Sequence, residues 1–178
     1  KHIAAGGQGA PLAVYGDYIL NKFKKQNVIL LNIGGIANFT YIPRNQNFTA
    51  VYVTDTGPGN TLIDMWMRKY LNQPYDQDGA FAQSGQIHLK LLKQLKAHPF
   101  FKGEFPKSTG PEVFNLQFVE DIVHKLFLES HISHTDIVAT LTQYTAETIA
   151  LAIKNLTKTL RTKIIISGGG AHNTFLVS

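Results

Sequence analysis

The 178-residue chain has no cysteine, which excludes disulfides and metal sites built on thiolate ligands. It also has no apolar run close to the roughly 20 residues that a membrane-spanning helix needs. Its first residues, Lys1-His2-Ile3-Ala4-Ala5, lack the apolar core of a secretory signal. With 44% apolar and 16% charged residues, the composition is that of a globular protein. We therefore expect a cytoplasmic protein without a membrane partner.

Arginine is scarce, with only Arg44, Arg68 and Arg161, and the 17 basic residues exceed the 12 acidic ones by a net charge of +5. The lysines are scattered, and they do not alternate with aromatic residues as they do in nucleic-acid-binding modules. The charge is typical of a solvated basic surface and is compatible with a small anionic substrate. No nucleic-acid partner is expected.

Short β-branched runs predict strands in the first third of the chain. Residues 28–33 and 36–42 meet at Gly34-Gly35, which predicts a tight antiparallel hairpin. Residues 50–54 predict a third strand that ends on Asp55 and completes a three-strand meander.

Apolar residues at helical spacing predict four helices later in the chain, over about residues 60–71, 87–95, 118–127 and 135–160. The continuous apolar run at 163–167 indicates a buried parallel strand, followed by Gly168-Gly169-Gly170 and the start of a helix. The chain is thus an α/β protein. Because no helix follows to cover the last strand, we expect a piece of a longer protein.

Three glycine-containing segments are candidates for binding. The Gly34-Gly35 turn could direct backbone amides at an anion or be an ordinary hairpin. Asp55 is followed by Gly57-Pro58-Gly59 and a helix, a position that suits a general base or, equally, a helix cap. The turn at residues 168–170 could admit a phosphate or a planar ring, or it could serve close helix–sheet packing. No lysine follows it, which excludes a Walker phosphate loop.

Other polar residues are weaker candidates. His131 and His134 have no third ligand nearby in the sequence, so no metal site is expected. Turn and capping roles are favoured for Asp76 and Asp78, and Lys107 is interpreted as an exposed loop lysine.

The order of the three glycine segments is similar to that of the actin-like ATPase lobe, an analogy at the level of the fold. Eight segments further resemble the anhydro-N-acetylmuramic acid kinase family in order and spacing, over essentially the whole chain. They are residues 5–12 (AGGQGAPL), 31–38 (LNIGGIAN), 55–60 (DTGPGN), 74–76 (PYD), 106–110 (PKSTG), 114–115 (FN), 139–142 (ATLT) and 168–170 (GGG).

This resemblance implies a function and a set of site residues. The family transfers the γ-phosphate of ATP to the 6-hydroxyl of anhydro-N-acetylmuramic acid and opens its anhydro bond with water, in the recycling of cell-wall peptidoglycan. It implies Asp55 as the catalytic base and Mg²⁺ as the ion that neutralises the phosphates. The implied sugar contacts are Gln8, Gly9, Gly57, Gly59 and Asn60. The implied nucleotide contacts are Gly34, Gly35, Asn38, Gly168, Gly169 and Gly170.

The resemblance also implies the domain organisation. The fold expected is a ribonuclease H-like (actin-like ATPase) lobe with a mixed sheet, truncated at both ends. Residues 1–27 would be the tail of an N-terminal lobe and an interlobe helix, and residues 28–178 an incomplete C-terminal lobe with a helical insertion at about 72–134. Such a piece is expected to be inactive alone, and a homodimer stays open. Alternatives are a kinase of another sugar and a non-catalytic nucleotide-binding module.

Pro111 and His172 depart from the pattern of this family. Pro111 stands where the family usually has a basic residue, and His172 replaces a usual arginine in the last glycine-rich turn. Either change could alter nucleotide or interdomain contacts, and neither involves Asp55.

Overall fold

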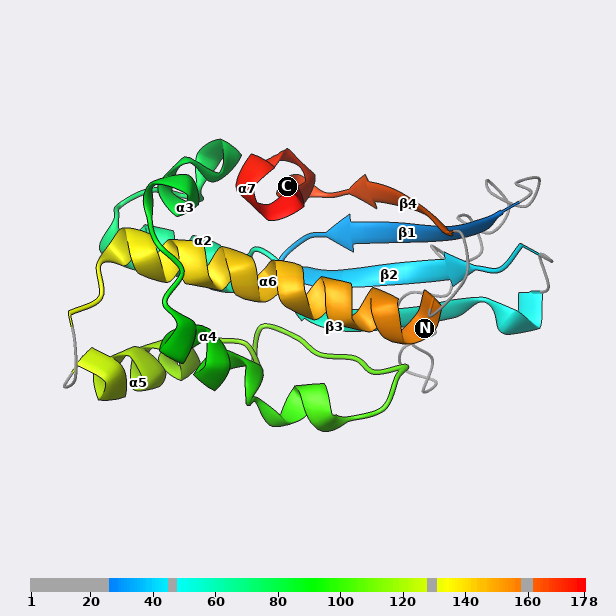
Figure 1. Ribbon diagram of the computed structural model, residues 1–178, viewed down its shortest axis with the longest axis horizontal. Coiled ribbons are helices and arrows are strands. Elements are labelled where there is room, and N and C mark those ends of the chain that lie inside the picture. The colour runs from blue at the N-terminus through cyan, green and yellow to red at the C-terminus, as the bar shows by residue number, and fades with distance from the viewer. Residues whose placement is uncertain (1–25, 45–47, 128–130, 158–161) are drawn as a thin grey trace, which may run out of the picture.

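The computed structural model describes residues 26–44, 48–127, 131–157 and 162–178. Four strands form one mixed sheet in the order β3-β2-β1-β4 (Figure 1). Their bounds are β1 Asn27–Ile33, β2 Ile36–Ile42, β3 Tyr52–Pro58 and β4 Thr162–Ser167. The first three strands pair antiparallel as a meander, and β4 lies parallel to β1. The expected hairpin at Gly34-Gly35 and the expected meander are both confirmed.

The predicted end of the third strand is wrong. β3 runs on to Pro58, which pairs with Ile36, and a register shift between Ala37 and Asn38 accommodates the extra residue. Asp55 therefore lies inside the strand, opposite Asn38, and not at its carboxyl end.

The described chain also contains helices of two kinds. The α-helices are α2 Thr61–Tyr70, α3 Ala80–Ser84, α4 Leu89–Lys96, α5 Leu116–Phe127, α6 His134–Thr157 and α7 Thr174–Val177. The 3-10 helices are η2 Phe48–Ala50, η3 Gln77–Gly79, η4 Pro99–Lys102 and η5 Gly169–His172. Sequence periodicity predicts α2, α4, α5 and α6 but not the five-residue α3, which is shorter than two helical turns.

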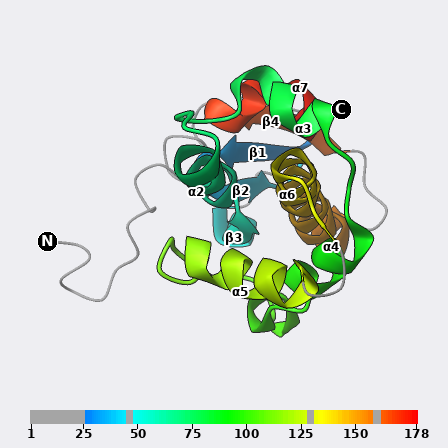
Figure 2. The same cartoon turned by 90° about the vertical axis from the view of Figure 1, so that its left-hand side faces the viewer.

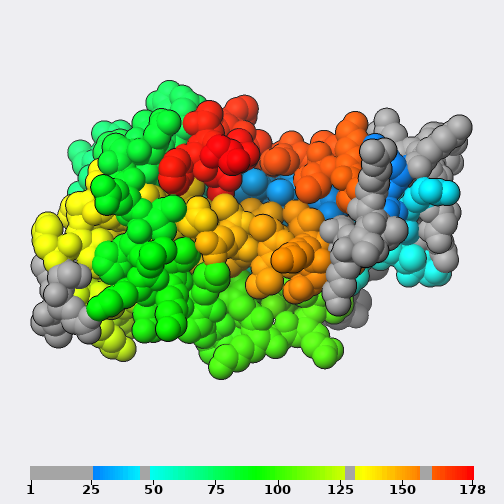
Figure 3. Space-filling model, viewed as in Figure 1, coloured from blue at the N-terminus to red at the C-terminus, as the bar shows by residue number. Residues whose placement is uncertain are grey.

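The long helix α6 lies across one face of the sheet and organises two cores (Figures 1 and 2). Ile149 and Ala152 of α6 pack on the strands, against Ile29, Leu31 and Phe39. The first half of α6 packs instead against α2, α3 and α4, and Leu141 and Tyr144 lie in the core that it shares with them. In the space-filling view, α6 fills the centre of this face, with α7 and β4 above it and α4 below (Figure 3). Helix α6 thereby connects the sheet to the helical part of the chain.

Strand β4 is parallel to β1 as predicted, but the expectation that it is buried is wrong. Ile164 and Ile166 are 44% and 42% exposed. They lie at the edge of the sheet, and Ile33 and Ile153 line an apolar groove of about 450 Å³ beside them. A continuous apolar run indicates that a strand is to be covered on both faces, but it does not reveal which segment covers it.

No helix in the described ranges is both long enough and apolar enough to cross a membrane. The predicted first domain, 1–27, lies almost wholly outside the described residues, and the division of the chain into lobes stays a prediction. Helices α3, α4 and α5 fall within the predicted insertion at about 72–134.

Tyr144 provides a test of the helical core. Its ring is fully buried, and its hydroxyl has no hydrogen-bond partner in the described structure. Because a buried hydroxyl without a partner gives no net stabilisation, Tyr144→Phe should leave the free energy of unfolding unchanged or raise it by about 1 kcal/mol. Tyr144→Ala should lower it by about 3–5 kcal/mol through the cavity that it creates. Urea denaturation measures both, and a loss above about 2 kcal/mol for the Phe variant would show that the hydroxyl has a partner.

Candidate active site at the glycine end of the sheet

Four polar residues form a row across the sheet near its glycine turn. Asp55 of β3 pairs with Asn38 of β2, Asn38 pairs with Asn32 of β1, and Asn32 pairs with Ser167 of β4. Paired residues on neighbouring strands project to the same face, and alternate residues project to opposite faces. This polar row therefore lies on the face opposite Leu31 and Phe39, which pack towards α6. We call these four residues the polar strip, and its member in β1, Asn32, precedes the Gly34-Gly35 turn by two residues.

Asp55 is half-buried and held in place by the loop that runs beside β3. Its Oδ2 accepts a hydrogen bond of 2.8 Å from the backbone N–H of Thr109, and its own N–H donates to the carbonyl of Lys107 at 2.9 Å. Burial raises the pKa of this carboxyl above its ordinary value, and the Thr109 N–H partly counteracts that rise. Such a carboxylate is oriented and poorly solvated, which suits a general base.

Asp55 does not cap the following helix, so the capping alternative is wrong. Asn60 is the N-cap residue of α2, and its side chain makes no capping hydrogen bond. The backbone N–H groups at the start of α2 donate instead to the hairpin turn, Gly59 and Thr61 to the carbonyl of Gly35 and Asn60 to that of Gly34. These three amides lock two glycine segments together and are not presented to a ligand.

The late glycine turn joins the other two glycine segments. A Cβ added at Gly168, where φ is +84°, would lie 2.6 Å from the carbonyl oxygen of Ile33 and 2.7 Å from Oδ1 of Asn32. The Nδ2 of Asn60 donates to the same Ile33 carbonyl at 3.4 Å. Residues 33, 60 and 168 are therefore neighbours in space although they are far apart in sequence.

A cleft of about 470 Å³ opens beside this junction. Gly169 and Gly170 line one side of it, Asn60 and Asp64 of α2 line another, and Tyr75 and His172 also border it. A Cβ at Gly169 would meet only Asn60 Nδ2, at 3.6 Å, so bare backbone is exposed there. The cleft has the size and the glycine lining to accept part of a nucleotide or of another small ligand.

Asp64 is the most perturbed acid of the cleft. Burial raises its pKa to about 6, with Arg68 opposing the rise and Asp76 adding to it. Asp76 itself is buried, and its two carboxylate oxygens accept the N–H groups of Phe81 and Ala82, which confirms the capping role expected for it.

Of the residues predicted from sequence, the structure places Asn38 beside Asp55, Gly34 and Gly35 beside Gly59, and residues 168–170 beside Asn60. Gly57 differs, because it lies within β3 and packs against Phe101 on the side of α6. Gln8 and Gly9 lie outside the described residues. The roles assigned to all these residues stay predictions.

Two residues of this region escape the sequence analysis, although each carries a signal. Asn32 is the one polar residue in the apolar run at 28–33, and its side chain lies between Gly34 and Gly168. Asp64 follows Asn60 by four residues, which places both on one face of α2.

Comparison with known proteins gives consistent results for the whole chain. The model of the anhydro-N-acetylmuramic acid kinase family matches residues 1–178. Anhydro-N-acetylmuramic acid kinases of Pseudoalteromonas atlantica and Clostridioides difficile are 46% and 42% identical to it, over 99% and 98% of this chain. The match covers 44% and 45% of those proteins, so the chain spans a little under half of their length.

A solved structure shows the fold. The activator of the 2-hydroxyisocaproyl-CoA dehydratase from Clostridium difficile with bound ADPNP matches with a TM-score of 0.54 and 17% identity, over 93% of this chain and 54% of that one. The predicted ribonuclease H-like, actin-like ATPase lobe is confirmed as the fold class.

Gly169 and Gly170 are adjacent in the chain, but only Gly170 is tightly packed. A Cβ at Gly170 would overlap with the side chain of Ile33, so Gly170→Ala should lower the thermal midpoint by several degrees. The Cβ that Gly169→Ala adds would lie in open space, so this variant should leave the thermal midpoint unchanged within about one degree. Calorimetry of both variants tests this pair, and equal losses would contradict the geometry.

The raised pKa of Asp64 makes a prediction about stability. The folded state holds the Asp64 proton more tightly than the unfolded chain, so the resulting stability is present below the ordinary pKa of 3.8 and is lost as pH rises to about 6. Asp64→Asn should therefore raise the free energy of unfolding at about pH 8, by on the order of 1 kcal/mol after solvent screening, and change it little at about pH 4. Denaturation at both pH values measures the difference, and a destabilised variant at high pH would overturn this assignment.

Proposed function

The chain belongs to the anhydro-N-acetylmuramic acid kinase family, and on that basis we propose that its full-length protein converts anhydro-N-acetylmuramic acid, water and ATP into N-acetylmuramic acid 6-phosphate and ADP. The observation that carries the proposal is the half-buried Asp55 carboxylate, held by the Thr109 N–H and aligned with Asn38 at the glycine end of the sheet. A cytoplasmic role in peptidoglycan recycling goes with this activity.

Asp55 acts as the general base in this reaction. Its carboxylate accepts a proton from water as the water oxygen bonds to the anomeric carbon of the sugar. The bond from that carbon to the bridging oxygen breaks, and the released oxygen attacks the γ-phosphorus of ATP as the bond to ADP breaks. One carboxylate thus drives both the opening of the sugar and the transfer of the phosphoryl group. We assign Gly59 and Asn60, which follow Asp55, to the sugar, together with the predicted contacts Gln8 and Gly9. The predicted contact Gly57 is left out of this assignment, because it packs against Phe101 on the opposite face of the sheet.

The nucleotide occupies the other side of the site. Gly34, Gly35 and Asn38 are assigned to the phosphates, and residues 168–170 to the adenosine, in the cleft where bare glycine backbone is exposed. Asn32 joins the phosphate side because its amide lies between Gly34 and Gly168. The actin-like neighbour with bound ADPNP supports nucleotide binding on this fold.

Mg²⁺, when bound, neutralises the phosphates during transfer. In the described residues, no three His, Cys, Asp or Glu side chains gather as metal ligands. In phosphoryl-transfer sites Mg²⁺ is commonly bound by one or two carboxylates together with the substrate phosphates and water, so it would need few ligands from the protein.

The chain spans under half of its relatives, so the activity is proposed for the complete protein and this chain alone is expected to be inactive. A kinase of another sugar and a non-catalytic nucleotide-binding module remain the alternatives. The glycine-lined cleft fits all three, whereas the oriented and half-buried carboxylate of Asp55 favours catalysis.

Asp55→Asn in the full-length protein tests the base. Asparagine can accept the Thr109 N–H but cannot take a proton from water, so turnover should fall by about a thousandfold or more while the affinity for ATP changes less than about threefold. Because burial penalises the charged carboxylate, the variant should be at least as stable as the wild type at neutral pH. Product assay, ATP titration and thermal unfolding give the three readouts.

The outcomes separate the alternatives. Normal turnover in Asp55→Asn would remove Asp55 from catalysis. A wild-type protein that binds ATP but phosphorylates no sugar would favour the non-catalytic module, and one that phosphorylates a different sugar would keep the base and change the substrate.

A further inference from the structure

A loop segment runs along the outer edge of β3 and contacts Thr54 once and the proposed base, Asp55, twice. The N–H of Lys107 donates to Oγ1 of Thr54 at 3.0 Å, and its carbonyl accepts the N–H of Asp55 at 2.9 Å. Two residues later, the N–H of Thr109 donates to the Asp55 carboxylate. Because β3 is the edge strand of the sheet within residues 26–44, 48–127, 131–157 and 162–178, no further strand from these ranges holds Asp55 on that side. The segment 105–109, which we call the β3 strap, takes that place.

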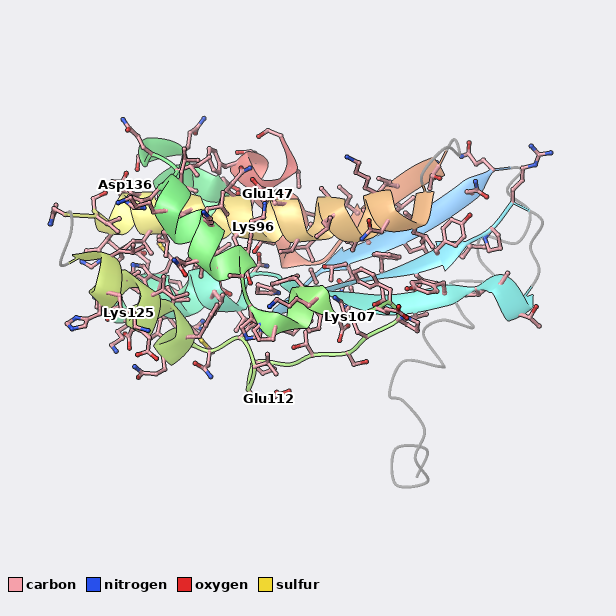
Figure 4. All side chains as sticks on the ribbon, turned by 60° about the horizontal axis from the view of Figure 1, so that its bottom comes forward. Lys96, Lys107, Glu112, Lys125, Asp136 and Glu147 are labelled. Atoms are coloured by element: carbon pink, nitrogen blue, oxygen red, sulfur yellow. The ribbon has the colours of Figure 1, made fainter. Side chains whose placement is uncertain are left out.

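The side chain of Lys107 folds back and closes the strap into a loop. Its Nζ donates to the carbonyl of Phe100 at 2.8 Å and to that of Gly103 at 3.1 Å. The same nitrogen lies 4.4 Å from the ring centre of Phe100 and 4.2 Å from that of Phe105. Figure 4 shows Lys107 next to the short helix η4, which contains Phe100. Lys107 is therefore not the exposed loop lysine that its sequence position suggests.

Lysine is well suited to this position. An ammonium group can donate to several acceptors from one point and bind the faces of aromatic rings. Burial lowers the pKa of Lys107, which shows that the group is drawn partly out of water. In the part of the chain that the structure describes, its contacts are carbonyls and rings and include no carboxylate. The charge thus serves to close the loop and does not form an ion pair.

We propose that Lys107 is a positioning residue for Asp55: by closing the loop from Phe100 to Lys107, its ammonium fixes the β3 strap so that the N–H of Thr109 meets the carboxylate. This inference rests on the proposed function only where it concerns turnover. Lys107 touches neither the reacting atoms nor the Asp55 carboxylate, and it acts through the backbone.

The consequence of loosening the strap has a definite direction. Burial and the Thr109 N–H are the two influences on the Asp55 pKa, and no charged side chain of the described residues adds a third. The N–H lowers this pKa and burial raises it. If the strap moves away without opening the site to water, the pKa of Asp55 rises further and less base is ionised at a given pH.

The test compares Lys107→Met with Lys102→Met in the full-length protein. Methionine keeps an apolar stem of similar length but donates nothing, and Lys102 is an exposed lysine in the same loop. In Lys107→Met the acid limb of the pH profile of kcat/KM should move to higher pH by about 0.5–1 unit, a loss of up to about tenfold on that limb. Activity should recover towards the alkaline plateau, and KM for ATP should stay within about twofold. Lys102→Met should behave as wild type.

A second readout does not depend on activity. The carboxyl signal of Asp55, assigned by its loss in Asp55→Asn, is titrated by NMR in the wild type and in Lys107→Met. A higher pKa in Lys107→Met supports the positioning role even if Asp55 proves not to be the base. An unchanged pKa, with turnover still lost in Asp55→Asn, overturns the inference and leaves the proposed function standing.

A milder variant covers the case in which Lys107→Met does not fold. Lys107→Arg keeps the charge but replaces the compact ammonium with a larger planar guanidinium, which donates in a fixed plane and so changes the geometry of the carbonyl and ring contacts. Its Asp55 pKa should shift in the same direction by a smaller amount. A pKa equal to that of the wild type, in a folded Lys107→Arg protein with altered carbonyl contacts, would contradict the proposal.

Discussion

Three backbone hydrogen bonds between the Gly34-Gly35 turn and the start of α2 are the constraint on which the rest of the site depends. They hold the hairpin against residues 59–61, and β3 carries Asp55 into the same region. The contact requires glycine, because a Cβ at Gly59 would overlap with the carbonyl oxygen of Gly34. Asn60, fixed in this way, reaches the Ile33 carbonyl beside Gly168. One junction thus sets the positions of the hairpin, the Asp55 loop and the late glycine turn.

Two carboxylates near this junction, Asp55 and Asp64, are partly buried, which makes their charged forms unfavourable. Asp55 and Asp64 both have pKa values raised by burial, and neither has a basic side chain hydrogen-bonded to it in the described chain. Groups of this kind lower the stability of a fold at neutral pH, and they are common where a protein needs a reactive carboxylate. The stability that they cost is offset elsewhere, in the apolar packing of α6 against the sheet and against the helices around Leu141.

Local patterns in the sequence predict the elements of the fold but not all of their surroundings. The hairpin and the helices α2, α4, α5 and α6 follow from turn residues and periodicity, which act over a few residues. The end of β3 could not be predicted, because it depends on a bulge in its pairing with β2. The exposure of β4 could not be predicted either, since periodicity does not reveal what covers a strand.

The candidate site, like the fold, can be predicted from the sequence only in part. Asp55 and the glycines can be recognised in the sequence as motifs. The cleft cannot, because it is lined by segments more than 100 residues apart. Asp64 becomes part of a site only because α2 lies beside the late glycine turn. Lys107 illustrates the limit most clearly. Its contacts with Phe100 and Gly103 are near in sequence, but their effect on Asp55 requires the strap to lie along β3.

In the proposed reaction, this lobe helps to open the anhydro sugar with water while a phosphoryl group passes to it. The most direct measurement is mass spectrometry of the product that the full-length protein forms from anhydro-N-acetylmuramic acid, ATP and Mg²⁺ in isotopically labelled water, stopped early. We expect N-acetylmuramic acid 6-phosphate with one labelled oxygen at the anomeric carbon and none in the phosphate. A product that carries the label in its phosphate, or a phosphorylated sugar with its anhydro bond intact, would contradict it.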